Sequence, residues 1–176
     1  SPLWTKEVIK GFKGHIWAPD ILFYNGNYYL FYSVSTFGKN NSCIGVAINK
    51  TLHSKDDSYK WIDHGIVIQS VKGRDFWNAI DPNVIFDEDS TPWLAFGSFW
   101  GGIKLVKLKK DLLGIEKPEE WYTIARRKFD FASSDTLAGE GAIEAPFIFR
   151  KDGYYYLFVS FDYCCRGINS NYKIAV

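Results

Sequence analysis

Residues 144–162, "EAPFIFRKDGYYYLFVSFD", place a carboxylate and a proline directly before two stretches rich in aromatic and β-branched residues. Such stretches predict β-strands, and the Lys151-Asp152-Gly153 turn between them predicts a hairpin. The same order of acid, proline, strand, turn, aromatic strand and serine recurs in "APDILFYNGNYYLFYSVS" (18–35) and "DPNVIFDEDSTPWLAFGSF" (81–99). The sequence therefore contains three copies of one hairpin template.

The three copies repeat with a nearly constant period. Their prolines, Pro19, Pro82 and Pro146, are 63 and 64 positions apart. Further strand-like segments follow the first two copies at 42–50 and 101–109, which makes about four strands per unit. A four-stranded unit repeated around an axis is the blade of a β-propeller, so the predicted fold class is all-β.

The chain, residues 1–176, holds about three blade-like repeats, which open near residues 17, 80 and 143. A closed propeller ring needs at least about four blades. An open arc would expose unpaired strand edges and an apolar flank. We therefore expect a partial propeller domain, completed by missing blades of the same protein or by a second chain.

The composition excludes several kinds of partner. Hydrophobic residues make up 47% of the chain, charged residues 23%, and the formal net charge is +1. A nearly neutral chain has no broad field to hold nucleic acid or an anionic membrane surface. No run approaches the roughly 18 apolar residues of a membrane span. The aromatic fraction of 18% supplies rings for a β-core or for stacking on a flat ligand face.

Cysteine and histidine give little support for a metal or disulfide site. The three cysteines, Cys43, Cys164 and Cys165, are an odd number, and adjacent cysteines bridge only through a strained ring. We therefore expect free thiols. The three histidines share no metal-ligand spacing with each other or with the cysteines.

Three carboxylates open the template copies. In a propeller the innermost strand of each blade begins near the central channel, so Asp20, Asp81 and Glu144 are expected to converge. Crowded, poorly hydrated carboxylates raise at least one pKa and leave the others ionised, as glycoside hydrolysis requires. Asp20 lies one position past its proline and is expected to cap a turn. Asp81 and Glu144 each follow Ala-Ile, and we predict that they are the catalytic pair.

Several stretches carry a family resemblance. The segments "NAIDPNVIFDEDSTPWLAFGSFWGGI" (78–103), "GEGAIEAPFIF" (139–149) and "SFDYCCRGINSNYKIAV" (160–176) resemble the endo-1,5-α-L-arabinanases of glycoside hydrolase family 43. "GHIWAPDI" (14–21) is similar to the second-blade motif of that family. The resemblance spans nearly the whole chain. It implies a five-bladed β-propeller that hydrolyses α-1,5-linked arabinan, or arabino-oligosaccharide, with inversion; because the polymer cannot enter cells, it also implies an extracellular protein.

By this resemblance Glu144 is the general acid, and Asp81 modulates the pKa of the acid and helps to orient it. The family's general base is an aspartate of the first blade, and residues 1–13 contain no aspartate. Inversion separates acid and base by about 6.5–9.5 Å, so one carboxyl cannot serve as both. We expect the chain to be catalytically incomplete alone. A sequence truncated from a longer protein is favoured over a half-protein that is completed by a second chain. The family's axial calcium or sodium ion lies near a histidine of the last blade, so no cofactor is expected in this chain.

The motif segments also offer side chains for sugar binding. The predicted contacts are rings that could stack on arabinofuranose and polar groups that could bond its hydroxyls, namely Trp17, Phe37, Trp77, Trp100, Asn78, Ser98 and Tyr163. Trp17 and Phe37 are favoured, because their segments match arabinanase segments that border the acid site. Asp162 and Arg166 are expected to form an ion pair that supports Glu144.

Other functions are compatible with parts of this pattern. Propellers that serve as protein-interaction platforms have repeats of about 40–45 residues with Gly-His and Trp-Asp signatures, which this period does not match. A non-catalytic propeller that binds arabino-oligosaccharide would keep the pocket without the base. Within the enzyme class, exo-arabinofuranosidase, β-xylosidase or arabinoxylan-debranching activity would use the same acids and differ in pocket depth.

Overall fold

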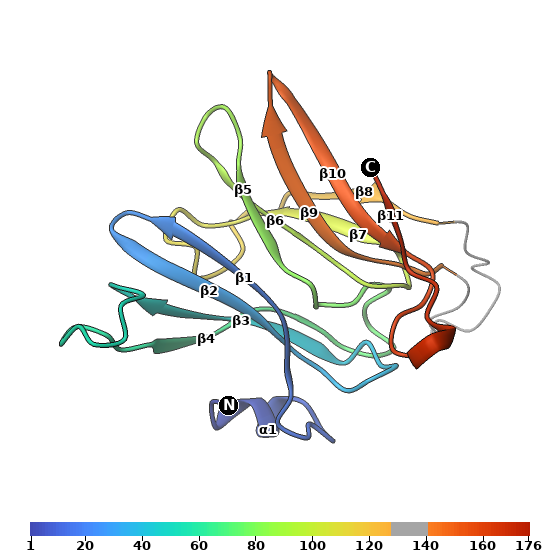
Figure 1. The fold of residues 1–176 in the computed structure, drawn as a ribbon, viewed down its shortest axis with the longest axis horizontal. Coiled ribbons are helices and arrows are strands. Elements are labelled where there is room, and N and C mark those ends of the chain that lie inside the picture. The colour runs from blue at the N-terminus through green and yellow to red at the C-terminus, as the bar shows by residue number, and fades with distance from the viewer. Residues whose placement is uncertain (128–140) are drawn as a thin grey trace.

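The computed structural model describes residues 1–127 and 141–176, which form three antiparallel sheets (Figure 1). The first sheet contains β1 (Ile16–Tyr24), β2 (Asn27–Val34), β3 (Ser42–Asn49) and β4 (Ile62–Ser70). The second contains β5 (Asn83–Phe86), β6 (Pro92–Phe96), β7 (Ile103–Lys107) and β8 (Trp121–Ala125). The third contains β9 (Ile143–Lys151), β10 (Tyr154–Phe161) and β11 (Lys173–Ala175). In each sheet the strands lie in chain order, as in a propeller blade.

The sheets lie side by side in the order of the chain (Figure 1), and their first strands contact one another, β1 with β5 and β5 with β9. A buried cluster that includes Phe31 of β2 and Phe96 of β6 fills the space between the first and second sheets. A smaller cluster of Ile103, Ile143 and Val159 joins the second sheet to the third. The chain therefore folds as three consecutive blades, as the repeat predicts.

The predicted hairpin turns are present. Asn25 and Gly26 have φ values of 48° and 76°, and Asp152 and Gly153 have values of 52° and 81°. Positive φ at both central residues is typical of two-residue type I′ turns, which match the twist of the flanking strands. The middle hairpin has a longer loop, in which the Asp87 carboxylate accepts two main-chain N–H bonds at 3.0 and 2.8 Å.

A left-handed residue precedes each template proline. Ala18, Asp81 and Ala145 have φ values of 40°, 58° and 53°, a region that residues with a Cβ adopt infrequently. The strand ladder shifts register at this point in the first and third sheets. Such irregularities re-aim the neighbouring side chains, so the start of each inner strand departs from regular alternation.

The sequence did not predict the α-helix at the N-terminal end, α1 (Trp4–Val8). It covers the first sheet, where Ile9 packs with Tyr32 and Val34 in a buried cluster. The Trp4 indole and the Tyr32 hydroxyl both donate hydrogen bonds to Asp63. A helix of five residues is too short to give a periodic signal, so its packing against the sheet stabilises it. A 3-10 turn, η1 (Gly167–Asn169), precedes β11.

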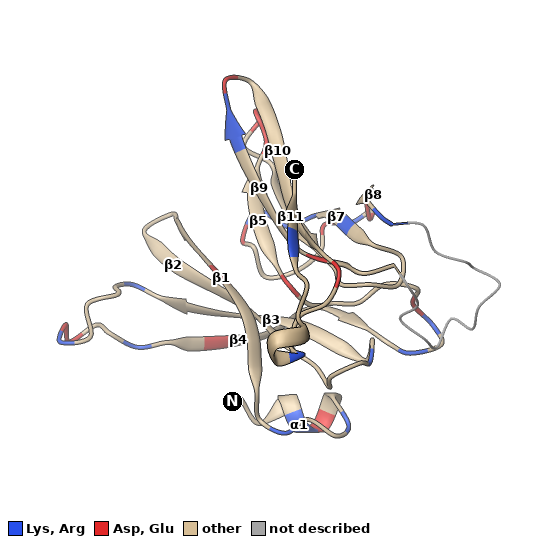
Figure 2. Ribbon diagram, turned by 45° about the vertical axis from the view of Figure 1, so that its right-hand side comes forward, with Lys and Arg blue, Asp and Glu red and all other residues tan. Residues whose placement is uncertain are grey.

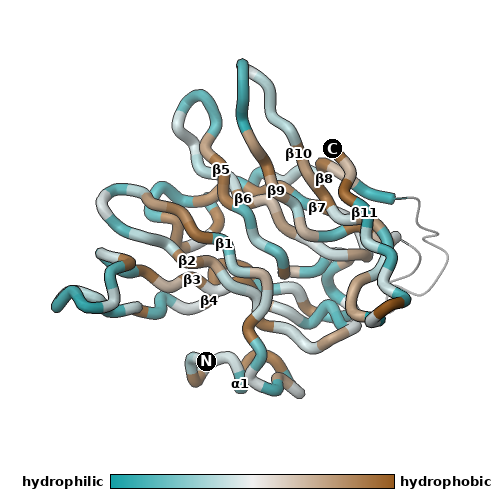
Figure 3. Tube along the Cα trace, in the orientation of Figure 1, coloured by the Kyte–Doolittle hydropathy of each residue, from teal (hydrophilic) through white to brown (hydrophobic). Residues whose placement is uncertain are grey.

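The surface carries mixed charges, and both ends of the arc expose apolar side chains. Basic and acidic residues are scattered over the strands and the loops between them (Figure 2), while hydrophobic segments follow the strands (Figure 3). On β1, Ile21 and Phe23 are 47% and 62% exposed, and on β9, Phe147 and Phe149 are 51% and 50% exposed. No helix within the described residues is long and apolar enough to cross a membrane.

We predict that Gly45→Ala destabilises the protein. A Cβ at this buried β3 position would lie 2.6 Å from the ring of Tyr32, whose hydroxyl is bonded to Asp63. Overpacking of this kind costs about 1–3 kcal/mol in the free energy of unfolding, measurable as a lower urea midpoint. Gly114→Ala is the control, because its nearest atom would be 4.0 Å away. An equal loss of stability in both variants would contradict the argument.

Candidate active site

Asp81 connects all three sheets. It lies in the segment that leads into β5, and its main-chain N–H donates to the Ser33 hydroxyl of β2 at 3.0 Å. Its carboxylate oxygen Oδ2 accepts the main-chain N–H of Ala145 in β9, also at 3.0 Å. A residue of the second sheet is therefore fixed by the first sheet and reaches the third.

Glu144 lies at the start of β9, next to the amide that Asp81 binds. Its Oε2 accepts a hydrogen bond from the Ser98 hydroxyl at 2.7 Å. The main chain supports this contact, because the Phe99 N–H donates to the Ile143 carbonyl at 2.8 Å. The two predicted catalytic carboxylates are thus brought into one neighbourhood where the second and third sheets meet.

The environment favours protonation of this pair. Burial, followed by the charge of Glu144, raises the pKa of Asp81 to about 7, and the bond from Ala145 opposes the rise. Burial also raises the pKa of Glu144, and the bond from Ser98 opposes it. Two interacting carboxyl groups lose their protons as a pair, so the proton belongs to both sites. The site therefore offers a carboxylic acid beside a carboxylate near neutral pH.

Asp20 has a structural role, but it does not cap a turn of its own hairpin. Its Oδ2 accepts the Val84 N–H of the second sheet at 2.9 Å and faces the Asn83 amide at 3.4 Å. Asn83 repeats the arrangement one sheet further, where its Oδ1 accepts the Ile148 N–H at 2.8 Å. Burial raises the pKa of Asp20, and these bonds oppose the rise. Asp20 and Asn83 follow their prolines directly, so the template position joins adjacent sheets.

Two of the predicted sugar contacts keep accessible rings. Trp17 is partly buried and pairs across the β1–β2 ladder with Ser33, the residue that holds Asp81. Phe37 is 73% exposed on the turn between β2 and β3. An exposed ring on a loop that ends beside the segment leading to Asp81 is suited to contact a ligand.

Four other predicted contacts are directed inward. The Trp77 ring packs against Phe96 at 5.4 Å. Asn78 and Trp100 are each 3% exposed, and Ser98 is 4% exposed and donates to Glu144. These side chains offer little surface to a sugar in this conformation, so their predicted contacts gain no support.

Tyr163 lies in the loop after β10, beside the strand end that holds Glu144. Its ring is 5.8 Å from that of Phe99, which directly follows Ser98. The Arg166 guanidinium stacks over Tyr163 at 3.9 Å from the ring centroid. Tyr163 therefore borders the acid site, and its contact with a sugar stays a prediction.

The predicted Asp162–Arg166 ion pair is wrong. Asp162 pairs with Arg127 and, at 2.8 Å, with Lys173, because the fold brings the end of β8 and the start of β11 to it. Arg127 also donates to the Ala142 carbonyl at 3.3 Å, and so braces the segment that leads to Glu144. Neither partner of Asp162 is a close sequence neighbour, so spacing alone could not identify them.

The expectation of three thiols is also wrong. Cys164 and Cys165 form a disulfide in the loop after β10, where Cys165 adopts a left-handed backbone with φ 65°. Cys43 alone is free, and burial raises the pKa of its thiol to about 12. A thiol that titrates so high is unreactive at neutral pH, which assigns Cys43 to the core.

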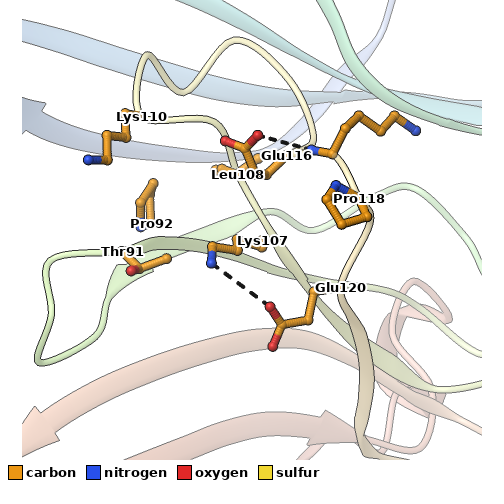
Figure 4. Close-up of a pocket in the computed structure, with 9 residues that line it drawn as sticks. Thr91, Pro92, Lys107, Leu108, Lys110, Glu116, Pro118 and Glu120 are labelled. Atoms are coloured by element: carbon orange, nitrogen blue, oxygen red, sulfur yellow. Dashed lines mark hydrogen bonds and ion pairs between the residues drawn. The ribbon is translucent and has the colours of Figure 1, made fainter.

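A separate pocket lies at the other end of the second sheet. It is lined by residues near the start of β6 and the end of β7, and by the loop before β8 (Figure 4). Its Glu116 accepts the Lys117 N–H at 3.0 Å, and Glu120 pairs with Lys107 at 3.9 Å. Ser98, which holds Glu144, lies past the opposite end of β6, so this pocket is distinct from the acid site.

The described residues do not form a metal site. In ranges 1–127 and 141–176, no three His, Cys, Asp or Glu side chains are grouped closely enough to hold an ion. These residues therefore do not fit the axial ion that the resemblance implies. Its location in other blades stays a prediction.

Comparison with known proteins identifies the family. The model of glycosyl hydrolases family 43 matches residues 2–176. The chain belongs to this family. It is 53% identical over 176 residues to an extracellular exo-α-(1→5)-L-arabinofuranosidase of Cellvibrio japonicus, and 48% identical over 177 residues to an extracellular endo-α-(1→5)-L-arabinanase of Bacillus subtilis. These matches cover 100% and 99% of the chain, but only 51% and 50% of the two relatives.

Solved family 43 structures share the fold. The structure of Cellvibrio cellulosa α-L-arabinanase complexed with arabinohexaose matches with a TM-score of 0.97 and 52% identity, over 99% of this chain and 55% of that one. A family 43 endo-arabinanase from Bacillus licheniformis matches with a TM-score of 0.83 and 47% identity, over 99% of this chain and 55% of that one. The chain therefore forms about three blades of an arabinanase-type propeller and spans about half the length of its curated relatives.

The sequence contained a signal for some site residues that it did not assign. Each template copy carries a serine near its end, and two of these, Ser33 and Ser98, bond to the acid that opens the following copy, Asp81 through its main-chain N–H and Glu144 through its carboxylate. The repeat indicates both serine positions, but their hydrogen-bond partners follow only from the way in which the sheets stack. Arg127 carried no such mark, because it lies outside the template.

We predict that Asp81→Asn stabilises the protein at about pH 8. A carboxyl whose folded pKa is raised binds its proton more tightly when folded, so its contribution to stability falls as pH rises from about 4 to about 7. The neutral amide avoids that loss, and the melting temperature should rise by about 2–4 °C for each kcal/mol regained. The gain should vanish at about pH 4.

Asp87→Asn is the matched control. Its bond from the Trp93 indole lowers the pKa of Asp87, so the amide should reduce stability at about pH 8. A fall in melting temperature for both variants would contradict the assignment of Asp81.

Proposed function

We propose that this chain is part of a secreted family 43 hydrolase that cleaves α-1,5-linked L-arabinofuranosyl bonds of arabinan with inversion. The observation that carries the proposal is the pair of Asp81 and Glu144, two carboxyls whose pKa values are both raised. The substrate is supported by the names of the relatives and by the neighbour solved with arabinohexaose. Secretion is supported by two relatives that are named extracellular.

In the proposed reaction Glu144 is the general acid. It donates its proton to the glycosidic oxygen as the bond to the leaving sugar breaks. The Ser98 hydroxyl fixes one carboxyl oxygen at 2.7 Å, which orients the group. Asp81 lies beside it, and like charges disfavour the ionisation of both carboxyls together, so Glu144 can act as the acid when the proton that the pair shares lies on it.

The general base is proposed to lie outside this chain. An inverting hydrolase needs a second carboxylate about 6.5–9.5 Å from the acid, with a water between them. Asp20 is the third carboxylate that opens a template copy, and its oxygen is occupied by the Val84 N–H at 2.9 Å. The exposed apolar residues of β1 and β9 support further blades, because such faces are normally covered. Those blades would supply the base.

Endo cleavage is our first proposal for the mode of action. Exo cleavage is the second candidate, because the 53% identical relative is named an exo-acting enzyme. Linear arabinan separates the two, since endo cleavage lowers its viscosity early and exo cleavage releases small products of constant size. A non-catalytic binding propeller would bind arabinohexaose and release no product.

We predict that Glu144→Gln in the full-length protein lowers kcat on linear α-1,5-arabinan by about 10²–10⁴-fold. The amide keeps the shape of the acid but cannot supply its proton. Binding of arabinohexaose, measured by calorimetry, should stay close to that of the parent protein.

The control is Glu116→Gln, a glutamate in the separate pocket of Figure 4. This variant should keep the parent rate. If Glu144→Gln also kept it, Glu144 would not be the acid.

We predict that Phe37→Ala raises KM on arabino-oligosaccharides by about two- to twelvefold, because loss of the exposed ring would remove a stacking energy of about 0.5–1.5 kcal/mol. The value of kcat should change little. Tyr59→Ala, which removes a 39% exposed ring in the loop between β3 and β4, should leave KM unchanged. A KM unaffected by Phe37→Ala would remove Phe37 from the proposed sugar site.

A further inference from the structure

The segment 75–81, which delivers Asp81, contains no strand, and side chains of the first sheet hold it. The Asn40 amide, 1% exposed, donates to two carbonyl oxygens of the segment at 2.9 and 3.4 Å. The buried hydroxyl of Ser70 accepts the Ala79 N–H at 3.0 Å. The position of this segment is therefore set by a neighbouring sheet.

Two buried hydroxyl groups also bind this segment, through the side-chain amide of Asn78. The hydroxyls of Ser35 and Ser42 lie 2.6 Å apart, and Ser42 donates to the Asn78 Oδ1 at 2.7 Å. All three residues are at most 3% exposed. Buried polar groups need such partners, because water cannot replace them. Asn78 is thus bound to the protein interior.

The main-chain groups at the end of the segment, the Asp81 N–H and the Ile80 carbonyl, are also hydrogen-bonded. The Asp81 N–H donates to Ser33, which is fully buried, at 3.0 Å. The carbonyl of Ile80 accepts the Gly97 N–H at 2.9 Å, which joins the segment to the second sheet. With its main chain held in this way, the Asp81 carboxylate meets the Ala145 amide of the third sheet.

We propose that Ser33, Ser42 and Asn78 are positioning residues that hold Asp81 at its distance from Glu144. Asn78 then acts through Asp81 and does not contact the sugar. The proposal rests on the proposed function only for the role of Asp81 in the reaction. A displacement of about 1 Å in a catalytic constellation can lower a rate by about a hundredfold, so buried bonds remote from the substrate affect turnover.

The first test is Ser42→Ala in the full-length protein. Loss of the bond to Asn78 should lower kcat on linear arabinan by about ten- to a hundredfold, with KM nearly unchanged. Thr5→Val is the control, because it removes another fully buried hydroxyl, bonded to the Pro2 carbonyl at 2.6 Å in the N-terminal region. This control should keep the parent kcat. An unchanged kcat in Ser42→Ala would overturn the proposal.

The second test does not depend on activity. Burial, followed by the charge of Glu144 on β9, raises the pKa of Asp81, so an Asp81 displaced from this site should titrate closer to its ordinary pKa. The rise in melting temperature from Asp81→Asn at about pH 8 should therefore be smaller in the Ser42→Ala background than in the parent. An equal rise in both backgrounds would overturn the proposal.

A third variant covers the case in which Ser42→Ala does not fold. Ser33→Ala removes only the acceptor of the Asp81 N–H, and the same comparison with Asp81→Asn applies to it. If the parent protein fails to cleave arabinan, the proposed function fails. The melting comparison still decides whether these residues position Asp81.

Discussion

The structure depends on hydrogen bonds that run from a side chain of one sheet to a main-chain N–H of the next. The carboxylates of Asp20 and Asp81 and the amide of Asn83 each bind an N–H group 64 or 65 residues further along the chain. Within residues 1–127 and 141–176 the strand pairing between sheets is limited to the isolated Ser98–Glu144 bridge, so other main-chain N–H groups where the blades meet need side-chain acceptors. These acceptors set the angle and register between blades, which apolar packing alone leaves adjustable.

The same short motif thus serves architecture and chemistry. The residue after the proline, Asp20 or Asn83, joins adjacent sheets. The left-handed residue before the proline is the acid Asp81 in the second copy. Joining the sheets buries both Asp81 and Glu144 in part, and burial raises both pKa values. The burial that comes with packing of the sheets therefore also raises the proton affinity of Asp81 and Glu144. Above the raised pKa of Asp81, the charge of its carboxylate opposes folding.

The sequence predicts what repeats and misses what depends on a neighbouring sheet. The hairpins, the three-blade order and the convergence of Asp81 with Glu144 follow from the template, because each copy encodes its own strands and turns. The inward direction of Asn78 and Trp100 does not follow, since a residue in a loop motif can face either a pocket or the next blade. The partners of Asp162 lie just past β8 and on β11, which the fold brings to it, and α1 is too short to show a period.

The stability of a repeat protein is often treated as a sum of the stabilities of its repeats and of the interfaces between neighbours. The acid site does not divide in this way, because it depends on three blades at once. Asp81 lies in the segment that leads into the second sheet, is held by Ser33 of the first and reaches Ala145 of the third. Separating any two of these sheets would break one of its bonds before the strands within a blade lost theirs. The geometry of the acid pair should therefore be less stable than the fold of each blade, and the blade interfaces should control activity more than the blade cores do.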